Sequence, residues 1–190
     1  CPPRFLQDCS AQQLPNRETW NNPVAISYWE GRLYMLDPGA NQIWRYDPSG
    51  GTFAGMPLEY FTGSNRPNIS SAVDFSITPA GDLYLVTSAG VVAKFRGGEQ
   101  QDFALSAFGS QQMTAPTAMF MNTNPIAQGL YFAERGQRAI FETTMAGTFI
   151  NAYRAASDRP AGDFHRADVV RVHHAASRWW GQHLRNDSAF

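Results

Sequence analysis

The histidines are the residues of this chain most obviously able to do chemistry. All four lie towards the C-terminus, where they are His165, His173, His174 and His183. Imidazole is a common metal ligand and general base, and His173 and His183 could approach one another across a hairpin. Neighbouring residues of a strand point to opposite faces, however, so His173 and His174 would not converge, and nothing supplies a fixed third ligand. We therefore favour a structural role for this cluster and expect no cofactor.

Other catalytic patterns are equally weak. A serine nucleophile needs a sharp turn and a base within reach, whereas Ser64 and Ser110 fall in predicted loops. The glycine pairs at 50–51 and 97–98 lead into further strands. Because a phosphate-binding loop opens a helix, these glycines are interpreted as hairpin residues.

Two cysteines, Cys1 and Cys9, lie close together at the N-terminus. Their placement favours a small disulfide loop formed in an oxidising compartment. A lipid anchor on Cys1 and two unpaired thiols are the alternatives, and spacing alone does not separate the three.

The charge pattern excludes several classes of partner. The 190 residues carry a formal net charge of −1, and Lys94 is the only lysine among 15 basic residues. No basic run is available to follow a phosphate backbone, so nucleic acid is not expected as a partner. Since no apolar run approaches the roughly 20 residues that span a bilayer, direct membrane insertion is not expected either.

The elements that must position any site come from an internal repeat. The dipeptide Leu33-Tyr34 recurs as Leu83-Tyr84 and again as Leu130-Tyr131, at offsets of 50 and 47 residues. Apolar residues alternate around each copy, which is the periodicity of a strand. Further strands are predicted in each repeat at 42–47 and 57–61, at 91–96 and 101–105, and at 139–144 and 148–153. Four strands in fewer than about 50 residues describe one β-propeller blade.

The first copy carries a family resemblance. Its segments at 22–26 (NPVAI), 31–37 (GRLYMLD) and 41–46 (NQIWRY) resemble the NHL repeat, whose pattern runs from a Pro-initiated strand through Gly-x-Leu-Tyr-Val-x-Asp to Asn-x-x-Ile. The third copy is similar through 134–140, while the second has Thr87 in place of the aspartate. The second copy also lacks the asparagine, which predicts a shorter turn. The resemblance implies an all-β fold, a propeller with blades of four antiparallel strands.

The expected organisation is one propeller or partial propeller over 1–190. It comprises an N-terminal strand or loop at 1–21, blades at 22–71, 72–114 and 115–158, and a degraded partial blade at 159–190. A small closed ring of four blades is one possibility, and an excerpt of a larger, six-bladed ring is the other. We favour the excerpt. An open fan exposes sheet edges, so we expect it to associate with itself or with missing segments of a parent chain.

The resemblance leaves the function open, because NHL-like propellers include protein- or RNA-binding scaffolds, sugar-lactone hydrolases and lyases. A fainter resemblance is to extracytoplasmic segments of bacterial protein phosphatase 2C-like proteins, although no phosphatase motif is present here. Our first hypothesis is a non-enzymatic extracytoplasmic scaffold or sensor that binds a protein or small-molecule ligand. The alternative is a metal-dependent, lactonase-like hydrolase or lyase, for which Asp37, Asp74 and Glu134 would be the acidic ligands. These match poorly, since two end second strands and Asp74 lies in a first strand.

Turns between second and third strands gather at one end of a propeller, where loops bind ligands. The predicted ligand-binding residues therefore lie in or near these turns and are Asp37, Asn41, Asn65, Arg66, Glu134 and Arg135.

Overall fold

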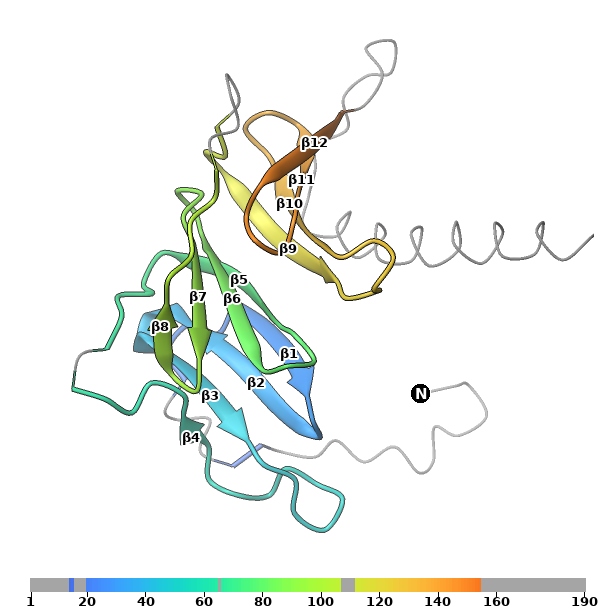
Figure 1. Cartoon of the computed structure of the whole chain (residues 1–190). Coiled ribbons are helices and arrows are strands. Elements are labelled where there is room, and N and C mark those ends of the chain that lie inside the picture. The colour runs from blue at the N-terminus through green and yellow to red at the C-terminus, as the bar shows by residue number, and fades with distance from the viewer. Residues whose placement is uncertain (1–13, 16–19, 65, 107–111, 155–190) are drawn as a thin grey trace, which may run out of the picture.

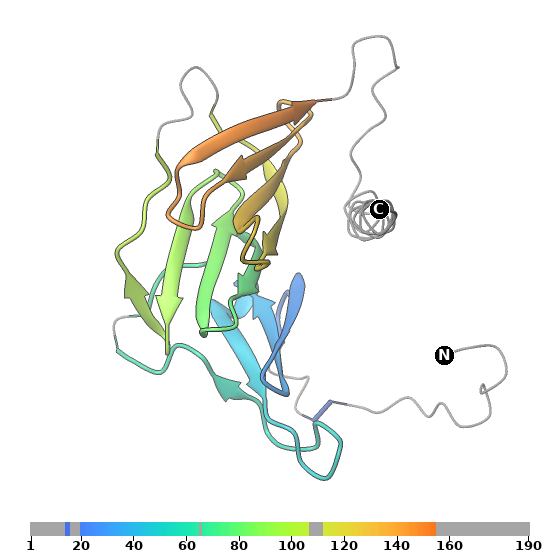
Figure 2. The same ribbon diagram turned by 45° about the vertical axis from the view of Figure 1, so that its right-hand side comes forward.

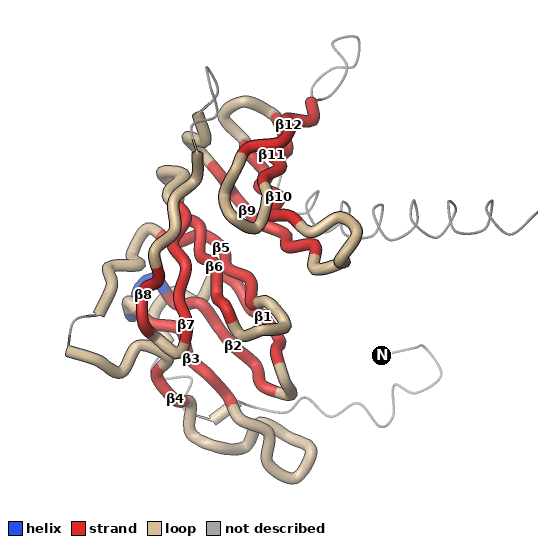
Figure 3. Tube along the Cα trace, viewed as in Figure 1, coloured by secondary structure: helices blue, strands red, loops and turns tan. Residues whose placement is uncertain are grey.

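The computed structural model describes residues 14–15, 20–64, 66–106 and 112–154. Cys1, Cys9, the four histidines and the predicted partial blade at 159–190 lie outside these residues, as does Asn65. The described part is all-β apart from a short 3-10 helix, η2, at Pro38–Ala40 (Figure 3). None of its helices is long and apolar enough to cross a membrane.

Within the described residues, twelve strands form three four-stranded antiparallel sheets, each in sequence order. Blade 1 contains β1 (Ala25–Trp29), β2 (Arg32–Asp37), β3 (Gln42–Tyr46) and β4 (Leu58–Glu59). Blade 2 contains β5 (Ala72–Ile77), β6 (Asp82–Thr87), β7 (Val92–Arg96) and β8 (Glu99–Gln101). Blade 3 contains β9 (Pro116–Asn122), β10 (Gly129–Glu134), β11 (Ala139–Thr143) and β12 (Phe149–Arg154).

The blades are arranged as an open fan (Figures 1 and 2). Their first strands are neighbours, because β5 contacts both β1 and β9. This is the inner-strand arrangement of a propeller, with the later strands of each blade spreading outwards. The observed fold is therefore a partial β-propeller, as the repeat predicted.

Alternating side chains give each blade two apolar faces. We call the face towards the following blade the front face and the face towards the preceding blade the back face. The front of blade 1 packs on the back of blade 2 through a core that includes Leu36, Ile43 and Phe95. The front of blade 2 packs on the back of blade 3 through a second core that includes Val86 and Phe132.

The β6–β7 turn has the predicted length, whereas β8 begins earlier than predicted. Leu36 pairs with Ile43 in blade 1 and Val86 with Val92 in blade 2, so the second turn is one residue shorter, as predicted. The last strand of blade 2 begins at Glu99, two residues before the predicted 101–105. Gly97 and Gly98 have φ values of 58° and 88° and close a hairpin directly after β7. Such a two-residue turn needs positive φ at both positions, which glycine adopts without strain.

Candidate binding pocket

Asp37 ends β2 and is completely buried. Its carboxylate accepts the backbone N–H groups of Asn21 and Asn22, each at 2.7 Å, and that of Ala40 at 3.1 Å. The Trp44 indole N–H lies 3.3 Å away. Burial acts to raise the pKa of Asp37, but these hydrogen bonds outweigh it and hold the pKa below its ordinary value. The side chain thus ties the segment that leads into β1 to the β2–β3 turn.

Glu134 has the same place at the end of β10 and is also buried. Its carboxylate accepts the N–H groups of Thr114 and Ala115 at 3.0 Å and that of Gly136 at 2.8 Å. Blades 1 and 3 therefore use an acid at the end of the second strand to hold the start of the first. Blade 2 has Thr87 there, whose hydroxyl accepts the Val91 N–H at 3.1 Å.

Asp74 joins two blades. It lies in β5, where its carboxylate accepts the N–H of Phe75 and, across the blade boundary, the N–H of Met119 in β9, both at 2.8 Å. The three proposed metal ligands are thus bonded to backbone amides in three different places. Among the described residues, no group of three or more His, Cys, Asp or Glu side chains could hold a metal ion. These acids do not fit the ligand set of a lactonase-like site.

Asn41 positions a loop. It has the left-handed φ of 52°, which asparagine tolerates better than most residues. Its side-chain amide donates to the Pro67 carbonyl at 3.0 Å, and its side-chain oxygen accepts the Ile69 N–H at 2.7 Å. The β2–β3 turn thereby fixes one end of the 61–67 loop, which connects blade 1 to blade 2.

Gln42 fixes the other end of this loop and was missed by the sequence analysis. The side chain is 1% exposed. Its Nε2 donates to the Phe61 carbonyl, and its Oε1 accepts the Phe61 N–H, both at 3.1 Å. In the sequence, Gln42 has the pattern of an ordinary polar strand residue, so only the fold shows that its side chain is buried and hydrogen-bonded.

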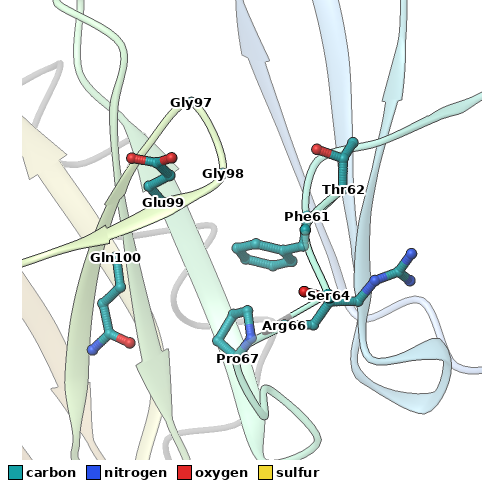
Figure 4. Close-up of a pocket in the computed structure, with 10 residues that line it drawn as sticks. Phe61, Thr62, Ser64, Arg66, Pro67, Gly97, Gly98, Glu99 and Gln100 are labelled. Atoms are coloured by element: carbon teal, nitrogen blue, oxygen red, sulfur yellow. The ribbon is translucent and has the colours of Figure 1, made fainter.

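A pocket of about 500 Å³ opens between the 61–67 loop of blade 1 and the β7–β8 hairpin of blade 2 (Figure 4). The Phe61 ring packs edge-on against Phe95 with centroids 5.1 Å apart, joining the loop to the core. The lining residues are Phe61, Thr62, Gly63, Ser64, Arg66, Pro67, Gly97, Gly98, Glu99 and Gln100.

The hairpin wall of the pocket depends on Gly98. A Cβ at this position would lie 2.4 Å from the backbone oxygen of Tyr60. Only glycine allows so close an approach between the hairpin and the chain leaving β4, and its φ of 88° adds to the requirement. At Gly97, by contrast, nothing lies within 4 Å of an added Cβ.

Arg66 provides the cationic group of the pocket. Its Nη2 lies 2.6 Å from Glu59 Oε2 and its Nη1 lies 3.4 Å from Oε1, so the pair has fork geometry. Both side chains remain about 40% exposed, at 41% and 39%. The guanidinium is therefore held in position while part of it still faces solvent.

The five predicted site residues that the structure describes do not form one site. Asn41 and Arg66 act on the same loop, while Asp37 is turned inwards beside them. Glu134 and Arg135 belong to blade 3, where the Arg135 N–H donates to the Ala115 carbonyl at 3.1 Å. The binding role assigned to all six stays a prediction.

Comparison with known proteins identifies the fold. No protein-family model and no curated protein sequence matches the chain. A virginiamycin B lyase from Staphylococcus aureus is similar in structure, with 18% identity and a TM-score of 0.51 over 77% of this chain and 45% of that one. A streptogramin B lyase structure has 16% identity and a TM-score of 0.43, over 74% of this chain and 57% of that one. A gluconolactonase from Xanthomonas campestris has 13% identity and a TM-score of 0.40, over 66% and 35%. The chain thus spans less than half of the first of these proteins, and the likeness identifies a partial β-propeller.

Proposed function

We propose that this chain is part of an extracytoplasmic propeller with NHL-like blades that binds an extended segment of a partner protein at the pocket between blades 1 and 2. The observation that carries this proposal is the pocket itself, which is open, polar and built on fixed backbone. Its loop is fixed at both ends by the buried Gln42 and by Asn41. A preformed surface of this kind loses little entropy when it binds.

The strand beside the pocket favours a peptide as the ligand. β8 pairs with β7 and, within the described residues, with no strand on its other side. The backbone of an edge strand can accept an added strand, and pockets for alternate side chains then provide specificity. Glu99 and Gln100 belong to both β8 and the pocket lining, so a peptide paired with β8 would reach the pocket.

The lining favours a polar inserted side chain. Thr62, Ser64, Glu99 and Gln100 are exposed and provide hydroxyl, amide and carboxylate groups, and Arg66 adds a positioned guanidinium. The one large ring, Phe61, is only 1% exposed and offers little stacking surface. A lactonase-like hydrolase or lyase has weaker support, because the acids it requires are bonded to backbone amides.

A random dodecapeptide library displayed on phage tests the proposal, with the wild-type protein as bait. Selected peptides are then measured against Ser64→Trp, which fills the pocket, and against Ser88→Trp, the same change at an exposed serine of the β6–β7 turn. We expect Ser64→Trp to weaken binding about tenfold or more, as loss of a central contact does, and Ser88→Trp to leave it unchanged. Peptides that bind Ser64→Trp and the wild type equally would contradict the proposal.

A further inference from the structure

The outer blades of the fan each leave one face without a neighbouring blade among the described strands. Tyr34 and Tyr84 occupy the same position on the front faces of blades 1 and 2, and each is 3% exposed beneath the next blade. The Tyr84 hydroxyl donates to the Met145 carbonyl of blade 3 at 3.2 Å, across the boundary. The equivalent residue of blade 3 is Tyr131, which is only partly buried.

The front face of blade 3 is apolar and aromatic. Phe120 packs against Tyr131 with centroids 6.2 Å apart, and Tyr153 is 49% exposed beside them. The hydroxyl groups of Tyr131 and Tyr153 both donate to Glu142, at 2.8 Å and 2.5 Å. The polar ends are thus paired within the blade, and the rings remain as contact surface.

The back face of blade 1 has no preceding blade among the described strands. Ile26 pairs with Met35 as Phe75 pairs with Leu85 in blade 2, so Ile26 and Phe75 are equivalent positions. Phe75 is 3% exposed against blade 1, whereas Ile26 is 70% exposed and its neighbour Tyr28 on the same face is 68% exposed. The β1 part of this face is therefore open in blade 1. In β2 and β3 the same face is already covered, because Met35 and Tyr46 are 5% and 0% exposed and the Trp20 indole donates to the Tyr46 hydroxyl at 2.7 Å.

We propose that the front face of blade 3 in one copy of the chain stacks on the back face of blade 1 in a second copy. The two faces repeat the two sides of the junctions that already join blades 1, 2 and 3. Within one molecule they lie at opposite ends of the fan and do not meet (Figures 1 and 2). Each copy offers one face of each kind, so a head-to-tail dimer satisfies both.

Sedimentation velocity on the full chain, from about 1 to 100 µM, tests this proposal. Tyr28→Lys places a charge on the blade 1 face and Tyr153→Lys places one on the blade 3 face, where Glu142 can pair with it. Ile126→Lys is the control, because Ile126 is 89% exposed in the β9–β10 turn and lies on neither face. We expect a wild-type dimer, a dissociation constant raised about tenfold or more by either face variant, and no change with the control.

Mixing the two face variants identifies the pairing. A head-to-tail dimer of Tyr28→Lys with Tyr153→Lys contains one unmodified junction, so the mixture should associate more tightly than either variant alone. A symmetric contact between two blade 3 faces would instead leave Tyr28→Lys as tight as the wild type, and this result would overturn the proposal. A wild-type protein that stays monomeric throughout the range, or a control that dissociates as readily as the face variants, would also overturn it.

Discussion

Replacing Asp37 by alanine tests how the segment leading into β1 is held to the β2–β3 turn of blade 1. The change removes the acceptor for the Asn21 and Asn22 N–H groups at 2.7 Å, and for weaker bonds from Ala40 and Trp44. Hydrogen bonds to a charged group contribute roughly 1.5–3 kcal/mol each when their loss leaves buried partners unpaired. The two asparagine amides are only partly buried and regain water, so we expect a net loss of about 3 kcal/mol. That is a large share of the roughly 5–15 kcal/mol that stabilises a typical domain.

Urea unfolding of Asp37→Ala and the wild type at several pH values measures this loss. The pKa of Asp37 is lower in the folded state than its ordinary value of 3.8, so the carboxylate stabilises the fold fully above about pH 5. That stabilisation is lost as the pH falls below 3.8 and through the folded pKa. The difference in free energy of unfolding between Asp37→Ala and the wild type should therefore become smaller in acid. Asp102→Ala, at an exposed aspartate, is the control and should change stability by less than about 0.5 kcal/mol. A loss below about 1 kcal/mol at pH 7, or a stability difference that does not change with pH, would show that the Asp37 carboxylate does not hold this segment.

Three further tests probe contacts within blade 2 and at its junctions with blades 1 and 3. Gly98→Ala should lower the free energy of unfolding by about 2 kcal/mol or more in urea unfolding, because its Cβ meets the Tyr60 oxygen, whereas Gly97→Ala should cost about 1 kcal/mol from positive φ alone. Asp82→Asn removes the ion pairs to Arg96 at 2.6 Å and Lys94 at 3.0 Å and should cost about 1 kcal/mol, less at high salt, since Arg96 is 59% exposed. A cost equal at low and high salt would contradict this assignment. Tyr84→Phe removes the hydrogen bond to blade 3 and should lower stability by about 1 kcal/mol in thermal melts; no loss would mean that water replaces the bond.

The fold could be predicted because the blade repeat is recognisable from patterns of residues close together in the sequence. Tyr34, Tyr84 and Tyr131 recur at near-constant spacing, and strand periodicity together with glycine turns is sufficient to place four strands in each unit. The start of β8 was predicted two residues too late, because Gly97-Gly98 forms a two-residue turn. A glycine pair in the sequence does not by itself show where the following strand begins.

The candidate pocket could not be predicted in the same way. It lies between two blades, so its walls come from residues about 35 positions apart that only packing brings together. Gln42 and Gly98 matter because of what they contact, and neither contact has a local sequence signal. Asp37 and Glu134 were predicted from their turn positions, but the sequence does not show that their carboxylates face the backbone of the preceding segment.

Amide hydrogen exchange in the presence of a selected peptide shows whether peptide binds between blades 1 and 2, because it locates the contact without any substitution. We expect slower amide exchange in β8 and the 61–67 loop when peptide is added, with exchange at the blade 3 turn at 135–138 unchanged. Protection confined to blade 3, or none at β8 while the peptide remains bound, would contradict the assignment of the pocket between blades 1 and 2 as the binding site.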